Sequence, residues 1–203
     1  MPTQSTAHFF FNWAKERIDE MDATVASLES KAAQVQAESR VKAEQLIADL
    51  RKKRNEFEST VKEQAEGSEA AREAIKARLE IQWKGFESQI KKYLEAFGKD
   101  VKQQHVVFQS QVTAQLQAWR EAADKIHAAA GEFAAGQRKE IDASVSRMRA
   151  DAAAAEAKLQ KLAQAGTESW SALSAALTET RAAFDRANQA AREAFKRAAG
   201  TVQ

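Results

Sequence analysis

Residues 75–119 read IKARLEIQWKGFESQIKKYLEAFGKDVKQQHVVFQSQVTAQLQAW and place a large apolar residue at every eleventh position. The members of this row are Ile75, Phe86, Phe97, Phe108 and Trp119. A second row follows four residues later, at Leu79, Ile90, Val101 and Val112. Because an α-helix turns about 100° per residue, eleven residues make three turns with a drift of only about 20°. The pattern therefore predicts long amphipathic helices, each with one apolar face.

The composition of the 203-residue chain favours helix throughout. Pro2 is the only proline, so the residue that best interrupts helices is missing from the rest of the chain. Hydrophobic residues make up 44%, with many alanines among them, and charged residues make up 30%. Alanine has the highest helix propensity, and no segment alternates apolar and polar residues as a strand does. We expect an all-α protein.

The net charge and the absence of cysteine limit the kinds of partner and the cellular compartment that we expect. The 31 basic and 29 acidic residues give a net charge of only +2, whereas nucleic-acid binders usually carry a clear basic excess. The chain has no cysteine, which excludes disulfides and thiol chemistry and fits a reducing compartment. No stretch approaches the roughly 20 apolar residues of a membrane-spanning helix. We expect a cytoplasmic protein, peripheral to a membrane at most, with no nucleic-acid partner.

The first predicted helical arm carries a heptad stripe. Ser5 or Thr6 is a candidate N-cap, because a side-chain oxygen there can accept a free backbone N–H. The stripe weakens at Ser39 and Lys42 and then resumes. Its first members are Phe11, Ala14, Ile18, Met21, Val25, Leu28, Ala32 and Val35. This spacing is typical of a helix that packs along another helix.

Glycines mark the predicted breaks between arms. Gly67 and Ser68 supply a helix stop and a new N-cap. Gly85 and Gly98 are interpreted as tolerated or close-packing positions, because the apolar register continues across both. We expect a lead at 1–6, one elongated helical domain at 7–199 and a tail at 200–203. The domain consists of three arms, at 7–66, 69–130 and 137–199. The last arm has a break near 166. Arms of about 60 residues are about 90 Å long. Two breaks between equal arms predict an elongated antiparallel coiled-coil bundle, although the apolar phase also runs through Gly67, as it would in a kinked longer helix.

No motif indicates catalysis. The chain has neither a phosphate-binding glycine loop nor a nucleophile elbow nor an H-E-x-x-H motif. His105 and His127 fall at matching points of the repeat, but on one helix they lie roughly 33 Å apart, too far to share a metal ion. We expect a non-enzyme with no cofactor and no catalytic, cofactor-binding or metal-binding residue.

The aromatic segment near the N-terminus is one of two candidate contact sites. Phe9, Phe10 and Trp13 stand beside Phe11, yet Phe9 and Trp13 project more than 100° away from the heptad stripe. That is more apolar surface than one stripe needs. These side chains either pack over the bundle end or a dimer partner, or enter a lipid interface.

The other candidate site is the only local cluster of basic residues, Arg51, Lys52, Lys53 and Arg54. Four consecutive residues spread around a helix as a collar. The collar is either a solvated surface near Glu56 and Glu58 or a contact for an anionic membrane, where each basic residue contributes about 1 kcal/mol.

The eleven-residue rows, together with Leu173, Phe184 and Phe195, resemble the amphipathic repeats of exchangeable apolipoproteins. That resemblance implies binding to lipid surfaces through helices. The arms of similar length with an aromatic N-terminal segment are also similar to BAR-type membrane-shaping dimers. Neither resemblance assigns a role to a particular residue.

These observations leave two functional hypotheses. The first is a non-catalytic coiled-coil scaffold that forms a homodimer and presents helix faces to a helical protein partner. The alternative is a peripheral protein of a lipid or storage-granule surface, in which the N-terminal aromatics and the basic collar make the contact.

Overall fold

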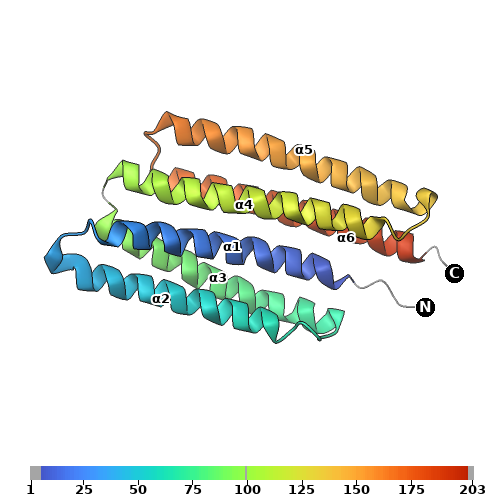
Figure 1. Cartoon of the computed structure of the whole chain (residues 1–203), viewed down its shortest axis with the longest axis horizontal. Coiled ribbons are helices and arrows are strands. Elements are labelled where there is room, and N and C mark those ends of the chain that lie inside the picture. The colour runs from blue at the N-terminus through green and yellow to red at the C-terminus, as the bar shows by residue number, and fades with distance from the viewer. Residues whose placement is uncertain (1–5, 99, 201–203) are drawn as a thin grey trace.

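The computed structural model describes residues 6–98 and 100–200 and contains six α-helices and no strand within those ranges. The helices are α1 (Ala7–Ala32), α2 (Ala37–Lys62), α3 (Glu69–Phe97), α4 (Val101–Ala130), α5 (Ala135–Ala165) and α6 (Trp170–Gly200). All six run along the long axis of the molecule, with their connections at its two ends (Figure 1). The all-α prediction is confirmed.

Helix α1 occupies the middle of the bundle. It packs along α2 on one side and along α4 and α6 on the other. Figure 1 shows α2 and α3 at one edge of the molecule and α5 at the opposite edge, where α5 packs on α4 and α6. This central position explains why α1 buries side chains on more than one face.

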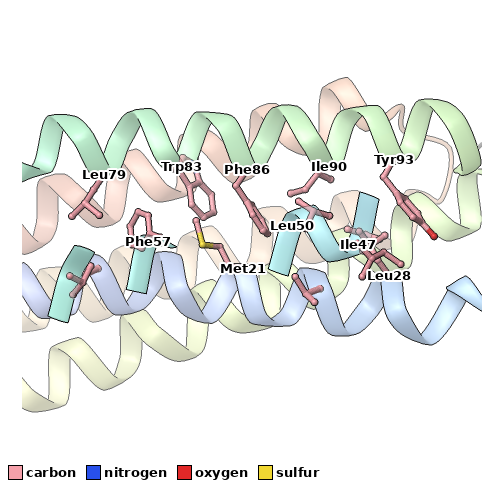
Figure 2. Packing of buried hydrophobic residues seen from close by; sticks show 14 of the residues in the cluster. Met21, Leu28, Ile47, Leu50, Phe57, Leu79, Trp83, Phe86, Ile90 and Tyr93 are labelled. Atoms are coloured by element: carbon pink, nitrogen blue, oxygen red, sulfur yellow. The ribbon is translucent and has the colours of Figure 1, made fainter. Parts of the chain in front are cut away.

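The largest apolar cluster joins α1, α2 and α3. In Figure 2, Trp83, Phe86 and Ile90 of α3 point toward residues of α1 and α2 such as Met21 and Leu50. The heptad stripe of α1 and the eleven-residue row of α3 both contribute to this cluster, because each row places its residues on one face.

Two further clusters lie among α4, α5 and α6. One contains Trp119 and Phe184, whose ring centroids are 5.5 Å apart, together with Phe195. The other surrounds Phe108 and Leu173. The row of Leu173, Phe184 and Phe195 is therefore buried along the length of α6.

The three predicted arms are six shorter helices. Helix breaks lie near Gly67, between 131 and 134, and at Gly166, but two more occur at 33–36 and 98–100. Each helix has 26 to 31 residues and is therefore about 39 to 47 Å long, about half of the predicted 90 Å.

The helix ends beside Gly98, so its interpretation as a tolerated position in a continuous helix was wrong, whereas the close-packing alternative agrees with its crowded surroundings. A Cβ atom at Gly98 would lie 2.7 Å from Leu94 Cδ2 and 2.9 Å from the Leu94 backbone. The Asp100 side chain then accepts a hydrogen bond from Lys102 N at 2.9 Å and caps α4. The apolar row continues from Phe97 to Phe108 across this turn, so periodicity alone concealed it.

The predicted caps are confirmed in part. Ser68 caps α3 by accepting a hydrogen bond from Ala71 N. Thr6 is the N-cap residue of α1 but makes no capping bond; its hydroxyl instead donates to Glu69. Ser5, most of the predicted lead and residues 201–203 of the tail lie outside the described residues.

Candidate functional site

Buried charges on α1 form the most unusual feature of the molecule. Glu16, Arg17 and Glu20 are each at most 2% exposed. They follow Phe9 and Trp13 at the three- and four-residue spacing of one helix face. The central position of α1 turns this second face toward α4 and α6, and so brings the charges inside.

Arg17 connects three helices. Its guanidinium donates to Asp185 of α6 at 2.8 and 3.1 Å, to Glu80 of α3 at 3.1 Å and to Glu16 at 3.2 Å. It also stacks on Trp13, with 4.2 Å between the guanidinium carbon and the ring centroid. Such stacking and multiple bonding are typical of buried arginine.

Arg181 of α6 has a matching environment one turn further along the bundle. It donates to Glu20 at 2.7 Å and to Glu87 of α3 at 3.1 Å, and its guanidinium lies 4.3 Å from the ring centroid of Trp83. Gln115 of α4 donates to the other oxygen of Glu20 at 2.9 Å. Both arginines are therefore bonded to carboxylates of α1 and α3.

Burial dominates the titration of the two inner carboxyl groups. It raises the pKa of Glu16 to about 8, although the nearby positive charges of Arg17 and Arg181 oppose this rise. Burial also raises the pKa of Glu20, against Arg181 and the hydrogen bond from Gln115. A protonated Glu16 leaves fewer uncompensated negative charges inside the bundle.

Ion pairs continue along α3 and α6 toward the end of α6. Arg192 donates to Glu73 at 2.7 Å and also to Glu69. Lys196 pairs with Glu69 at 2.7 Å, and these hydrogen bonds lower the pKa of Glu69 to about 2.

We call the whole set the α3–α6 ion-pair seam. Its carboxylates on α3 are Glu69, Glu73, Glu80 and Glu87, and its cations are Arg181, Arg192 and Lys196 on α6 and Arg17 on α1.

Two hollows flank the central ion pairs of this seam. One, of about 550 Å³, lies between α3, α4 and α6 and is lined by residues such as Leu94, Trp170 and Arg181. The other, of about 620 Å³, has Trp13 of α1 among its lining residues. Apolar side chains therefore do not fill the space between α3 and α6.

The chemistry available at this site is mutual charge neutralisation. The converging carboxylates and arginines bind one another, and within residues 6–98 and 100–200 no group of three or more acidic or histidine side chains is arranged to hold a metal ion. His105, expected at the edge of an apolar face, is instead buried, and neither ring nitrogen has a hydrogen-bond partner among the described residues.

The predicted aromatic contact residues lie inside the bundle. Phe9, Phe10 and Trp13 are each at most 4% exposed. Phe9 packs against Phe195 with ring centroids 5.6 Å apart, and Trp13 packs near Phe57 at 6.3 Å. Within this fold they follow the packing alternative, and contact with lipid requires the bundle to open.

Two residues of the basic collar form ion pairs with α1. Arg54 donates to both oxygens of Asp22 at 2.6 and 2.9 Å, and Arg51 pairs with Glu29, so both tie α2 to α1. Lys52 is exposed, and Lys53 is half-buried.

Sequence reasoning missed the buried charges, although a signal was present. The row Phe9, Trp13, Glu16, Glu20, Thr24 and Ser27 keeps the three- and four-residue spacing of one helix face, and all six side chains are buried. Two stripes on one helix predict burial on two sides, and that burial would have placed the acidic residues of the second stripe inside.

Comparisons with protein-family models, with curated proteins and with solved structures return no match for this chain. No helix in the described part of the chain has the length and apolar character needed to cross a membrane.

Proposed function

We propose that this chain is a non-catalytic protein that binds an extended apolar surface, such as a lipid monolayer or a storage granule. In this proposal the bundle opens and lays its amphipathic helices on the surface. The observation that carries it is the location of the apolar rows, which the chain covers with its own helices. On the outer surface of the bundle, the large apolar residues that the described chain exposes are Val41, Ile81, Val101 and Val106.

The shape of the apolar faces supports an extended ligand. Each helix carries a stripe about 39 to 47 Å long, which fits a surface better than a small molecule. Amphipathic helices of 20 to 30 residues with charged outer faces are typical interfacial elements. We further propose that the bundle is an antiparallel coiled coil. This packing keeps every apolar stripe covered while the protein is not bound to a surface.

The scaffold hypothesis has less support from the surface of the closed molecule. A stable homodimer usually buries a continuous apolar patch, and the four exposed apolar residues lie on three different helices. The proposal therefore follows the resemblance to exchangeable apolipoproteins, with a cytoplasmic, peripheral location.

Flotation with phospholipid-coated triolein droplets tests the proposal. We expect the intact chain to float with the droplets, to keep its far-ultraviolet helical signal and to lose its near-ultraviolet aromatic signal as the packed rings separate. A chain that stays in the aqueous phase would contradict the proposal. A stable dimer under those conditions would favour the scaffold instead.

A further inference from the structure

Resting on the proposed function, we propose that the bundle opens at the α3–α6 ion-pair seam, whose cations then bind the phosphates of anionic lipid headgroups. The occupant of the opened seam is thus an anionic, lipid-coated apolar surface. Headgroup phosphates replace the carboxylates of α3 as partners of Arg181, Arg192 and Lys196.

The first argument is the way in which α3 is attached. Helix α3 packs along α1 and α2 and has at most a marginal backbone contact with α4 or α6. Ion pairs bridge it to α6, and hollows of about 550 and 620 Å³ lie where apolar packing would otherwise be. The carboxylate partner in each of these pairs is about 40% exposed, so water can replace the cation at the carboxylate as the helices separate, and this interface opens more easily than the apolar ones.

The second argument is the accessibility of the carboxylates. The side chains of Glu73, Glu80 and Glu87 are 44%, 41% and 39% exposed, whereas those of Arg181 and Arg192 are 6% and 10% exposed. An anionic surface that approaches the seam therefore meets these carboxylates and Lys196, which is 40% exposed, before it meets the two arginines, and it repels the carboxylates. The arginines left behind have the planar, two-pronged geometry that binds phosphate.

The third argument is what the seam covers. Trp83 of α3 stacks on Arg181 and belongs to the same apolar cluster as Phe86 and Ile90. The hollow beside Trp13 already opens to solvent between α3 and α6, and movement of α3 away from α6 widens it and begins to expose this cluster. The cations and the apolar face then lie side by side, as binding to a charged lipid surface requires.

A triple variant tests the site of opening. Glu73→Gln, Glu80→Gln and Glu87→Gln weaken the seam and keep the size of each side chain. The matched control is Asp124→Asn, Glu156→Gln and Glu179→Gln, whose carboxylates pair across the α5 contacts with Arg120, Arg149 and Lys158. Both variants change the net charge by the same amount, so general attraction to an anionic droplet is equal.

The readout is the rate of uptake by triolein droplets coated with phosphatidylcholine plus about 30 mol% phosphatidylglycerol. We expect the seam variant to bind about three- to thirty-fold faster than the control variant. Equal rates for the two variants, with the wild-type chain still binding, would overturn the seam as the opening site. Failure of the wild-type chain to bind would instead overturn the proposed function.

A second pair of variants tests whether the seam cations bind headgroups. This test remains valid even if the triple variant does not fold. Arg192→Gln with Lys196→Gln removes two seam cations, and Arg149→Gln with Lys158→Gln removes two cations elsewhere. We expect the ratio of uptake by anionic droplets to uptake by pure phosphatidylcholine droplets to fall about three-fold more for the seam pair. Equal ratios would show that these cations do not bind headgroups, and would contradict the proposal.

Discussion

Glu16 links burial on α1 to the pH dependence of the whole bundle. Its carboxyl group is 1% exposed and faces Arg17 and Glu20 of its own helix and Arg181 and Asp185 of α6. Burial raises its pKa from 4.5 to about 8, so the folded chain holds a proton there that the unfolded chain releases. The stabilisation from this proton is complete below about pH 4.5 and is lost as the pH rises through about 8.

Glu16→Gln should remove that pH dependence, because glutamine imitates the protonated acid. We expect the wild-type free energy of unfolding, relative to the variant, to fall by up to about 1.4 kcal/mol per pH unit between pH 5 and pH 8. Urea unfolding across this range measures it. Glu95→Gln, at a side chain that is 63% exposed, is the control. Parallel curves for wild type and Glu16→Gln would show that Glu16 does not hold the proton.

Gly98 and Gly136 provide a second test at the scale of single residues. A Cβ at Gly98 meets the Leu94 backbone at 2.9 Å, whereas a Cβ at Gly136 meets nothing within 4 Å. We expect Gly98→Ala to destabilise the chain by about 1–3 kcal/mol. Gly136→Ala should stabilise it by about 0.5–1 kcal/mol, since alanine loses less backbone entropy in a helix. Thermal unfolding of the two variants compares them, and the reverse order would contradict the turn assigned to Gly98.

At the scale of helices, periodicity predicted which faces are buried better than where the helices end. The heptad stripe of α1 and the eleven-residue rows both lie in the core, because amphipathic spacing decides burial directly. The turn at 33–36 contains neither glycine nor proline, and Gln36, the N-cap residue of α2, makes no side-chain capping bond. The local sequence therefore lacks the usual turn and capping signals for that break, and the weakened apolar stripe at Ser39 and Lys42 is the nearest sign of it.

Helix α1 should be the most protected element. It buries 13 residues, against 6 for the alanine-rich α5, which lies at the edge of the molecule. Local opening is easiest where few apolar contacts must break. Hydrogen exchange followed by mass spectrometry should show slower exchange in α1 than in α5, and the opposite order would contradict the central position of α1.

The basic collar of α2 predicts different effects for neighbouring residues. Arg54→Gln should lower the free energy of unfolding by about 0.5–1 kcal/mol, because Arg54 binds both oxygens of Asp22 on α1. Lys52→Gln should leave it unchanged, since its pairing with Glu56 is long at 3.9 Å. Urea unfolding distinguishes the two. If Lys52→Gln costs as much stability as Arg54→Gln, the collar does not act through the α1–α2 ion pairs.

At the scale of the molecule, the chain combines two kinds of interface. One apolar cluster joins α1 to α2 and α3 and also includes Val107 of α4, and two others join α4, α5 and α6, with Phe9 of α1 in one of them. Charges join α3 to α6 across the hollows between them. In the proposed function, the bundle covers its apolar faces in water and releases them at a surface. This requires one interface that is weaker than the others, because interfaces of equal strength would give the bundle no preferred place to open.

The distance between α3 and α6 on a lipid surface tests this account most directly. The chain has no cysteine, so Ala77→Cys and Ala190→Cys, at two residues that line the same hollow, allow specific spin labelling of the two helices. Pulsed electron–electron double resonance should give one short distance in buffer and a clearly longer one on anionic triolein droplets. An unchanged short distance on droplets that carry the protein would show that the closed bundle itself binds, and would contradict opening at the seam.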